Sequence, residues 1–364
     1  MTNKYPRHLL GSLLVATLVL SACGSDDDAG GDNTDTTADT TADTTTNTAG
    51  DGDSVDAGGS ITVYTGRHYG IEPVFEEFTA DTGIEVRFTT GNDPELRERL
   101  IAEGANTPAD VVMTADAANI ELSAEADVLA SVDSDVLTET IPEELRSEDN
   151  EWFALSQRAR VIIASTERVE NPPTTYAGIG DPEWDGKLCL RPSTHPYTQS
   201  LVASLIIAEG EERATEIVQS WVDNDPLYIN SDTDIYNAVA DGECDVAIAN
   251  TYYLGRLLTE DPDFPVEIVW PEQDGRGAHV NVSTAAVTAN APNPEGARAL
   301  IEWLATDGQK QFADANFEYP VDPDVEPNDI VAGFGEFSAD LAAVRQLGAN
   351  QPAAVEVLSA TGYE

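Results

Sequence analysis

Basic residues are scarce in this chain of 364 residues, which has 18 Lys and Arg against 67 Asp and Glu and a formal net charge of −49. A protein that binds nucleic acid displaces phosphate counterions with basic side chains, and this chain has few to offer. A polybasic patch that binds anionic lipid headgroups is excluded for the same reason. The composition therefore excludes nucleic acid as a partner, and it excludes a membrane contact based on positive charge.

Enzyme motifs are also lacking. The sequence contains no Gly-x-Ser-x-Gly elbow, no His-Glu-x-x-His pair, no phosphate-binding glycine loop and no Gly-x-Gly-x-x-Gly. Only four His are present, and carboxylates are so abundant that no pair stands out as a catalytic acid and base. We therefore predict that the chain is not an enzyme, and a secreted hydrolase is kept only as an alternative.

The first apolar segment, Leu9–Leu20, is too short to span a bilayer comfortably as a mature helix, and it follows a basic start. It leads into the sequence Leu-Ser-Ala-Cys-Gly, which resembles the bacterial lipoprotein signal, cut before the Cys, whose sulfur then carries lipid. We predict a signal peptide over residues 1–22 and lipidation of Cys23, which would supply the several acyl chains that stable anchoring needs. The alternative is an ordinary cleavable signal.

Residues 23–59 have almost no large apolar side chains and contain ten Asp but no Lys or Arg. Such a segment cannot bury enough surface to offset the entropy of ordering, so we predict a disordered tether. Residue 60 onward carries 57 acids against 16 bases, a net charge of −41. This charge is typical of a solvated surface and says little about function.

The remaining chain alternates short β-rich runs with helical periodicity, which favours an α/β fold with mostly parallel, doubly wound sheets. Its length suits two lobes, and such sheets bind ligands at the carboxyl ends of their strands. The predicted strands cover residues 61–64, 84–88, 109–113, 153–165, 187–190, 246–249, 266–270 and 279–287, and the predicted helices cover residues 70–82, 94–103, 117–128, 198–209, 211–222 and 293–305.

Tyrosines follow three of these strands at the points where the strands end. They occur in the segments Thr65–Tyr69, Pro192–Tyr197 and Asn250–Tyr253. Two of the histidines, His68 and His195, lie in the same segments. Because strand carboxyl ends meet at one edge of a sheet, these side chains are candidates for a cleft site.

Phenol oxygens suit ferric iron, a hard and highly charged cation that prefers oxygen donors. A free Tyr has a pKa near 10 and stays protonated at neutral pH, but coordination to the metal can remove its proton. Tyr rings also stack on sugars without ionising. The residues alone therefore leave open a site for another small solute, such as an oxyanion, a polyamine or a sugar.

Two cysteines, Cys189 and Cys244, remain after Cys23. Outside the cytoplasm such a pair usually forms a disulfide. The closed loop of about 55 residues would be worth on the order of 4 kcal/mol in the chain-entropy estimate. The alternative is two buried free thiols.

From about Ser60 to its end, the chain resembles the ferric-iron-binding proteins of ABC importers, an extracytoplasmic family with a periplasmic-binding-protein type II fold of two doubly wound lobes joined by crossing strands. The segments that carry the resemblance are Val63–Tyr69, Ala109–Asp116, Ser156–Ile162, Arg191–Tyr197, Asp245–Gly255, His279–Ser283 and Glu318–Val321.

The resemblance implies that Tyr252 and Tyr253 are paired iron ligands and that Tyr197 is a further one. It places His68 and Tyr69 as ligands or near-ligands of the first loop. A carbonate or another synergistic anion, or water, would complete the site. Arg67 and Arg158 are predicted to hold the anion or to orient the tyrosinates, with a structural salt bridge as the alternative for each.

The resemblance also implies an arrangement and partners. One lobe would comprise residues 60–157 plus 279–318, and the other residues 158–278 plus 319–364, with crossings near residues 157–161 and 279–283. We expect a monomeric, lipid-anchored, extracytoplasmic protein that captures Fe(III) between the lobes and delivers it to an ABC permease and its ATPase. Cys189 and Cys244 match positions that look disulfide-linked in part of the family.

Overall fold

The computed structural model describes residues 59–67 and 70–364. Several predictions concern residues outside the described ones: the signal peptide, the lipidation of Cys23, the tether up to residue 58, and the ligand roles of His68 and Tyr69. The last residue of the predicted tether, Gly59, begins the first strand. Within the described part of the chain, no helix is long and apolar enough to cross a membrane.

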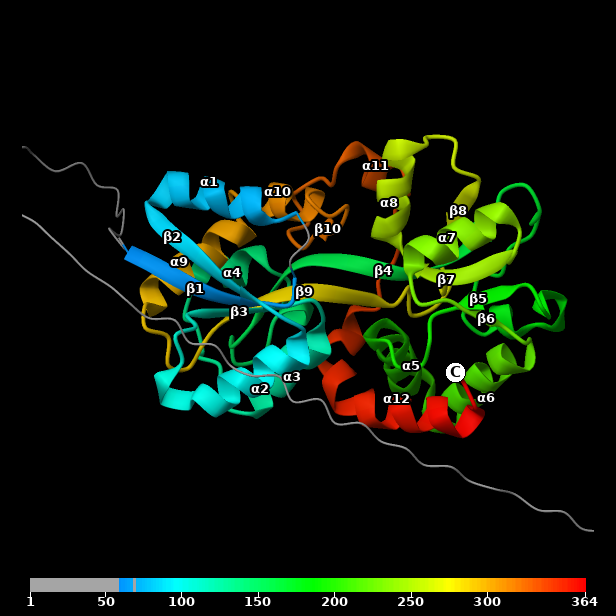
Figure 1. The fold of residues 1–364 in the computed structure, drawn as a ribbon, viewed down its shortest axis with the longest axis horizontal. Coiled ribbons are helices and arrows are strands. Elements are labelled where there is room, and N and C mark those ends of the chain that lie inside the picture. Colours follow the sequence, from blue (N-terminus) through cyan, green and yellow to red (C-terminus); the bar gives the residue numbers. More distant parts are fainter. Residues whose placement is uncertain (1–58, 68–69) are drawn as a thin grey trace, which may run out of the picture. The chain divides into compact units, whose positions relative to one another are not determined.

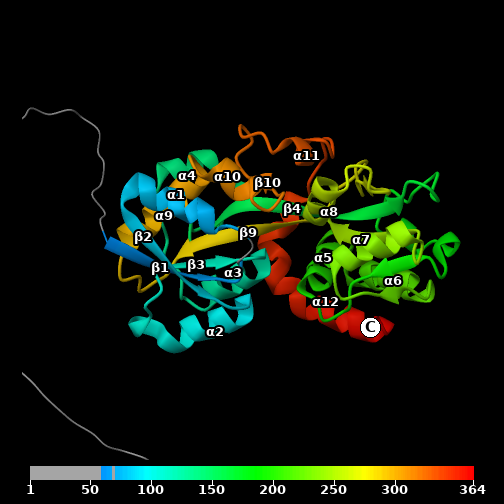
Figure 2. The same cartoon turned by 45° about the horizontal axis from the view of Figure 1, so that its top comes forward.

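One long strand organises the body. Strand β4 (Phe153–Ser165) pairs through residues 153–159 with β9 (Val280–Val287) and through residues 160–165 with two other strands. Its change of partner between Ala159 and Arg160 divides the sheet into two sections, each covered by helices (Figures 1 and 2). We call these halves the first lobe and the second lobe.

The first lobe is built on β1 (Gly59–Thr65), which pairs in parallel with β2 (Ile84–Thr90) and β3 (Val111–Thr114). Strand β9 then joins β3 and β4 by antiparallel pairing. The short β10 (Tyr319–Pro320) pairs with the first half of β4. The helices of this lobe are α1 (Glu72–Thr82), α2 (Asp93–Glu103), α3 (Ala117–Glu125), α4 (Asp135–Thr140), α9 (Pro294–Ala305) and α10 (Gln309–Asp314).

The second lobe contains β5 (Leu188–Leu190), in parallel with β6 (Leu227–Tyr228) and β7 (Val246–Asn250). Strands β7 and β8 (Val266–Val269) both pair antiparallel with β4. The further helices are α5 (Pro196–Glu209), α6 (Glu211–Asp223), α7 (Asp232–Asp241), α8 (Thr251–Glu260), α11 (Asp329–Ala332) and α12 (Leu347–Thr361). The C-terminal α12 packs against α5 and α6 of the second lobe and also against α3 of the first.

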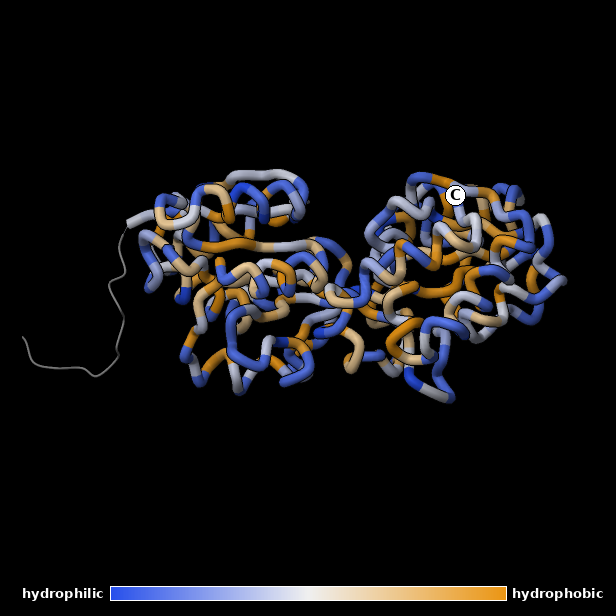
Figure 3. The backbone as a smooth tube through the Cα atoms, turned by 90° about the horizontal axis from the view of Figure 1, so that it is seen from below, coloured by the Kyte–Doolittle hydropathy of each residue, from blue (hydrophilic) through white to orange (hydrophobic). Residues whose placement is uncertain are grey.

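The central strands form the core because their apolar runs are buried on both faces. Every residue of β3, β7 and β9 is buried, and β4 is buried at all but one position. Apolar segments accordingly run through the interior of both lobes, with hydrophilic segments outside (Figure 3). The sheet edge is thereby held rigidly enough to position side chains at the strand ends.

The structure pairs Cys189 at β5 with Cys244 just before β7, at a Cα–Cα distance of 5.8 Å. This disulfide joins the two parallel strands that precede α5 and α8. The helices α5 and α8 that follow these strands carry Tyr197 and the pair Tyr252 and Tyr253 in their first turns.

Candidate functional site

Three tyrosines come together at the starts of two helices in the second lobe. Strand β5 leads into α5, in whose first turn Tyr197 lies, and strand β7 leads directly into α8, whose first turn contains Tyr252 and Tyr253. Because β5 and β7 are parallel neighbours, both helices begin at the same edge of the sheet. We call these three residues the tyrosine cluster.

The phenol groups of the cluster are in contact. The hydroxyls of Tyr197 and Tyr252 lie 3.1 Å apart, and the rings of Tyr252 and Tyr253 stack with centroids 4.1 Å apart. Tyr252 is only 3% exposed, whereas Tyr197 and Tyr253 are partly exposed. The first turns of α5 and α8 thus present adjacent phenol oxygens, which are hard donors, at one point.

Buried arginines surround this cluster. The guanidinium carbons of Arg158, Arg160 and Arg191 lie 5.6, 5.6 and 5.9 Å from the centre of the Tyr197 ring. Asp232 pairs with two of them, at 2.6 Å from Arg160 and 3.6 Å from Arg191. Among the described residues, Asp232 is the one carboxylate that pairs directly with these cations, and Glu318 and Asp116 act on Arg158 without an ion pair. Positive charge therefore predominates at the contacts with the phenol rings.

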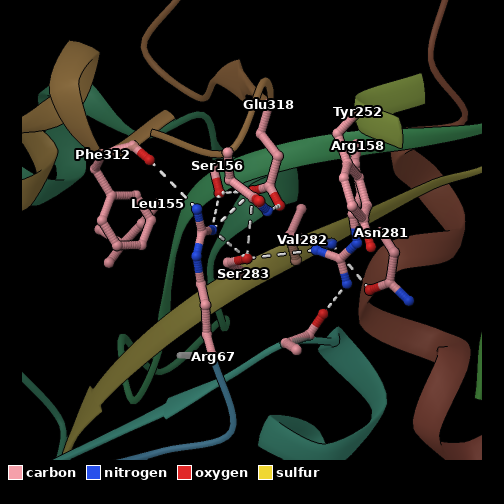
Figure 4. Close-up of polar contacts among 12 residues, drawn as sticks. Arg67, Leu155, Ser156, Arg158, Tyr252, Asn281, Val282, Ser283, Phe312 and Glu318 are labelled. Carbon is pink, nitrogen blue, oxygen red and sulfur yellow. Dashed lines mark hydrogen bonds and ion pairs between the residues drawn. The ribbon is translucent and has the colours of Figure 1, made fainter. Parts of the chain in front are cut away.

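Arg158 forms no ion pair with any carboxylate of the described residues. Its guanidinium donates to Ser283 Oγ at 3.4 Å and to the carbonyl oxygen of Ala115, beside the Tyr252 ring (Figure 4). Burial would lower the pKa of Arg158, but Tyr197, Glu318 and Tyr252 raise it above its ordinary value. Arg158 therefore stays charged and directs its positive potential toward the tyrosine cluster.

Two of the tyrosines, Tyr252 and Tyr253, are held in the protonated form. Burial, reinforced by the neighbouring Tyr197 and Tyr253, raises the pKa of Tyr252 well above its usual value of 10. Burial and Tyr197 raise the pKa of Tyr253 to about 12. Without a cation both groups are neutral phenols, and a metal ion has to displace their protons to bind.

Arg67 belongs to a separate polar cluster on the crossing strands (Figure 4). Its guanidinium donates to Glu318 at 2.7 Å, to Ser156 Oγ at 2.6 Å and to Ser283 Oγ at 2.5 Å. Both charged side chains are 2% exposed. Burial would raise the pKa of Glu318, but the charges of Arg67 and Arg158 keep it lowered. We call these four residues the Arg67 cluster; the proposed role of Arg67 in holding an anion stays a prediction.

The loop that precedes His68 and Tyr69, the predicted ligands, is anchored to the first lobe. Thr65 Oγ1 accepts from the Arg67 amide at 3.0 Å and donates to its carbonyl. A side chain at Gly66 would collide with Asp93 Oδ1 at the start of α2, so only glycine fits there. This packing brings the residues just before His68 against the first lobe's wall of the cleft.

A cavity of about 290 Å³ lies between the starts of α2 and α3 and the start of α5. On one side it is lined by Asp93, Asp116 and their neighbours, and on the other by His195 and Tyr197. His195 caps α5, since its Nδ1 accepts from the Tyr197 amide at 3.2 Å, and the two rings meet edge to face at 4.5 Å. The cavity thus gives access to one member of the tyrosine cluster from both lobes.

Some functional side chains were not found from the sequence. The ion pairs beside the tyrosines are formed by Arg160, Arg191 and Asp232. The negative charge of the Arg67 cluster comes from Glu318. In a chain with 67 carboxylates, nothing in the sequence singles out two that are buried. A usable signal is the scarcity of basic residues, against which Arg158 and Arg160 in the middle of β4 and Arg191 just after β5 form a concentration.

The chain matches the model of the bacterial extracellular solute-binding protein family over residues 74–338. It is 38% identical to iron uptake protein A1 of Synechocystis sp., with all of both chains covered. It is 26% identical to the major ferric iron-binding protein of Neisseria meningitidis serogroup B, covering 73% of this chain and 82% of that protein.

Solved structures that are similar to this chain agree with these relatives. A Trichodesmium protein in complex with iron and citrate superposes with a TM-score of 0.79 and 36% identity, covering 84% of this chain and 100% of that one. The ferric binding protein from Campylobacter jejuni superposes with a TM-score of 0.77 and 32% identity, with the same coverage.

Proposed function

The chain belongs to the bacterial extracellular solute-binding protein family, and we propose that its solute is ferric iron, which it binds through tyrosinate ligands. The membership confirms the predicted fold of two α/β lobes joined by shared strands. It also agrees with the prediction that the chain is not an enzyme, since its relatives are solute-binding proteins.

One observation carries the proposal: Tyr197, Tyr252 and Tyr253 present adjoining phenols, with the Tyr197 and Tyr252 hydroxyls 3.1 Å apart, beside an excess of buried positive charge. That charge favours the ionised form of the phenols once a metal takes their protons. Fe(III) is a hard cation that prefers anionic oxygen, so the three tyrosinates are the proposed ligands of the second lobe. His68 and Tyr69 are proposed to complete the site from the first lobe, with a carbonate or another anion as a further ligand.

The proposal extends to binding and delivery. We assign residues 60–157 plus 279–318 to the first lobe and 158–278 plus 319–364 to the second. Strand pairing places Arg158, Ala159 and the short β10 with the first lobe, so these bounds are shifted by a few residues at the crossings. Iron bound by both lobes would favour the closed arrangement. A monomeric protein anchored through lipid on Cys23 would then present the closed form to an ABC permease and its ATPase. The Cys189–Cys244 disulfide supports an extracytoplasmic location, because such bonds persist in oxidising compartments.

Colour tests the proposal directly, because tyrosinate bound to Fe(III) absorbs visible light. Purified mature protein is titrated with ferric iron, and the absorption band, the bound iron and the thermal midpoint are followed. We expect a band that saturates at one iron per protein and a rise in the thermal midpoint. A protein that stays colourless and shows no thermal shift would rule out ferric iron and favour another solute.

A further inference from the structure

Helix α12 and the two residues after it contact the chain just before Tyr197. The helix packs along α5 and α6 of the second lobe (Figure 1). It ends at Gly362, whose φ of 72° lies in the left-handed region that favours glycine. The next residue, Tyr363, is only 6% exposed. The turn at Gly362 therefore directs the Tyr363 side chain into the second lobe.

Two hydrogen bonds join the segment after α12 to residues 191–195, which connect β5 to α5 and which we call the β5–α5 loop. The Tyr363 hydroxyl donates to the carbonyl oxygen of Arg191 at 2.9 Å. The backbone amide of Ser193 donates to the backbone oxygen of Glu364 at 2.7 Å. Both bonds are made to backbone groups of the loop, so they fix its path.

A third connection comes from the body of α12. Gln351 Nε2 donates to Gln199 Oε1 at 3.0 Å, and Gln199 Nε2 donates to the carbonyl oxygen of Ser193 at 3.1 Å. Both backbone polar groups of Ser193 are thus held, one directly by Glu364 and the other through Gln199. A loop whose backbone groups have such partners loses these bonds if it moves.

The β5–α5 loop positions one member of the tyrosine cluster and the cation beside it. The guanidinium of Arg191, at the start of the loop, lies 5.9 Å from the centre of the Tyr197 ring. His195, at its end, accepts from the Tyr197 amide at 3.2 Å. A shift of the loop would therefore move both Tyr197 and Arg191. Residues that hold a metal ligand in place affect metal affinity without touching the metal.

Building on the proposed function, we propose that Tyr363 is a positioning residue for the iron ligand Tyr197. Its hydroxyl binds the backbone at Arg191, so it acts on Tyr197 through the β5–α5 loop. Loss of this hydroxyl would leave the ring beside Tyr228, at a centroid distance of 4.9 Å. The Arg191 carbonyl would keep only the longer bond from Thr198 Oγ1, at 3.4 Å.

The test is the variant Tyr363→Phe in the mature protein. Iron affinity is measured by competition with a chelator of known ferric affinity, and the visible band is recorded. We expect the dissociation constant for ferric iron to rise about threefold to tenfold, because one buried hydrogen bond that holds the loop is lost. The matched control is Thr361→Val, which removes a buried hydroxyl whose bonds, to Val357 and Leu358, stay within α12. It should keep the wild-type affinity.

A double-mutant cycle with Tyr197→Phe separates positioning of this ligand from a general structural role. If Tyr363 acts through Tyr197, then Tyr363→Phe should change the affinity of the Tyr197→Phe protein by less than about twofold. A purely structural effect would weaken binding equally in both backgrounds. If Tyr363→Phe shows no thermal transition, Gln351→Leu replaces it in the cycle, because it releases the same loop at Ser193.

The outcomes keep the two proposals apart. Wild-type affinity in the folded Tyr363→Phe protein would overturn the positioning role. An equal loss of affinity with and without the Tyr197 hydroxyl would overturn it as well, since the effect would then not pass through this ligand. A wild-type protein that binds no ferric iron would instead refute the proposed function.

Discussion

Two buried polar clusters meet near the crossing strands, and their charge balance differs. In the Arg67 cluster one cation and one carboxylate lie 2.7 Å apart, and Arg67 also donates to two Ser hydroxyls. Around the tyrosine cluster, Arg160 and Arg191 share the carboxylate of Asp232, and Arg158 forms no ion pair with a described carboxylate. Burial keeps Tyr252 and Tyr253 protonated by raising the pKa of each. The first cluster is electrostatically complete, whereas the second becomes complete only when anions form there.

The difference separates a structural role from a binding role. A complete pair gains nothing from a ligand and holds β4, β9 and the segment before β10 together. In the incomplete cluster the positive charge of the arginines is only partly balanced. It becomes balanced when a bound cation converts phenols into phenolates. Burial by itself does not distinguish the two, because Arg67 and Arg158 are both almost fully buried.

The largest effect is expected from removing phenols of the incomplete cluster. Replacing Tyr252 and Tyr253 together by Phe should abolish the visible band and lower the iron affinity by about a thousandfold or more, since two anionic ligands are lost. The control is Tyr319→Phe, because the Tyr319 hydroxyl has no hydrogen-bond partner among the described residues and lies outside the cluster. Survival of the band in the double variant would refute the assignment of these ligands.

Breaking the complete cluster should cost stability. Arg67→Met leaves Glu318 buried without its cation, and we expect the free energy of unfolding in denaturant to fall by about 3–5 kcal/mol. Arg67→Met/Glu318→Met removes both charges and should recover at least about half of that loss. A single variant within about 0.5 kcal/mol of the wild type would show that the pair contributes little.

The number of protons released when iron binds shows how many phenols of the tyrosine cluster ionise. Burial raises the pKa of Tyr252 well above 10 and that of Tyr253 to about 12, so both are protonated at neutral pH before iron binds and ionised afterwards. We therefore expect about two or three protons to leave per iron, and the affinity to fall about tenfold per released proton for each unit that the pH drops. Calorimetry in buffers of different ionisation enthalpy counts the protons, and release of none would contradict tyrosinate binding.

The smallest effect is expected at Arg158, the arginine beside the tyrosines that forms no ion pair with a described carboxylate. Arg158→Met should lower the iron affinity by about tenfold, since one positive charge beside the phenolates is lost. Its effect on unfolding should be smaller than that of Arg67→Met, because no buried carboxylate loses its direct ion pair. Arg158→Lys keeps the charge and should restore part of the affinity. Equal stability losses with unchanged affinity would remove the distinction between the clusters.

The strands were predicted more accurately than the helices. The bounds of β4 match those predicted, residues 153–165, because its apolar residues at both ends, Phe153–Leu155 and Val161–Ala164, are flanked by polar turns. Helices α7, α8 and α12 were not predicted as separate elements. The first two are short and begin at polar caps, and α12 contains Pro352 and depends on packing against three other helices. Tertiary contact, which a single sequence does not display, stabilises such helices.

The candidate site was predictable only where chemistry and position coincided. The tyrosines could be identified because they follow strands, and the structure brings Tyr197 to Tyr252 across 55 residues of sequence. The pair of Arg67 with Glu318, separated by 251 residues, could not be identified. Its partners depend on how β10 pairs with β4, and the sequence gives no cue to that pairing.

The contacts of the C-terminal helix α12 affect how the two lobes can move relative to each other. It contacts α5 and α6 on one lobe and α3 on the other, and a side chain at Gly348 would come within 3.1 Å of the Ala118 carbonyl. A change in the angle between the lobes must therefore slide or tilt α3 along this helix while β4 and β9 flex. We expect the lobes to pivot where the α12 backbone at Gly348 contacts α3. The range of lobe rotation would then depend on this contact between two helices, which is remote from the tyrosines.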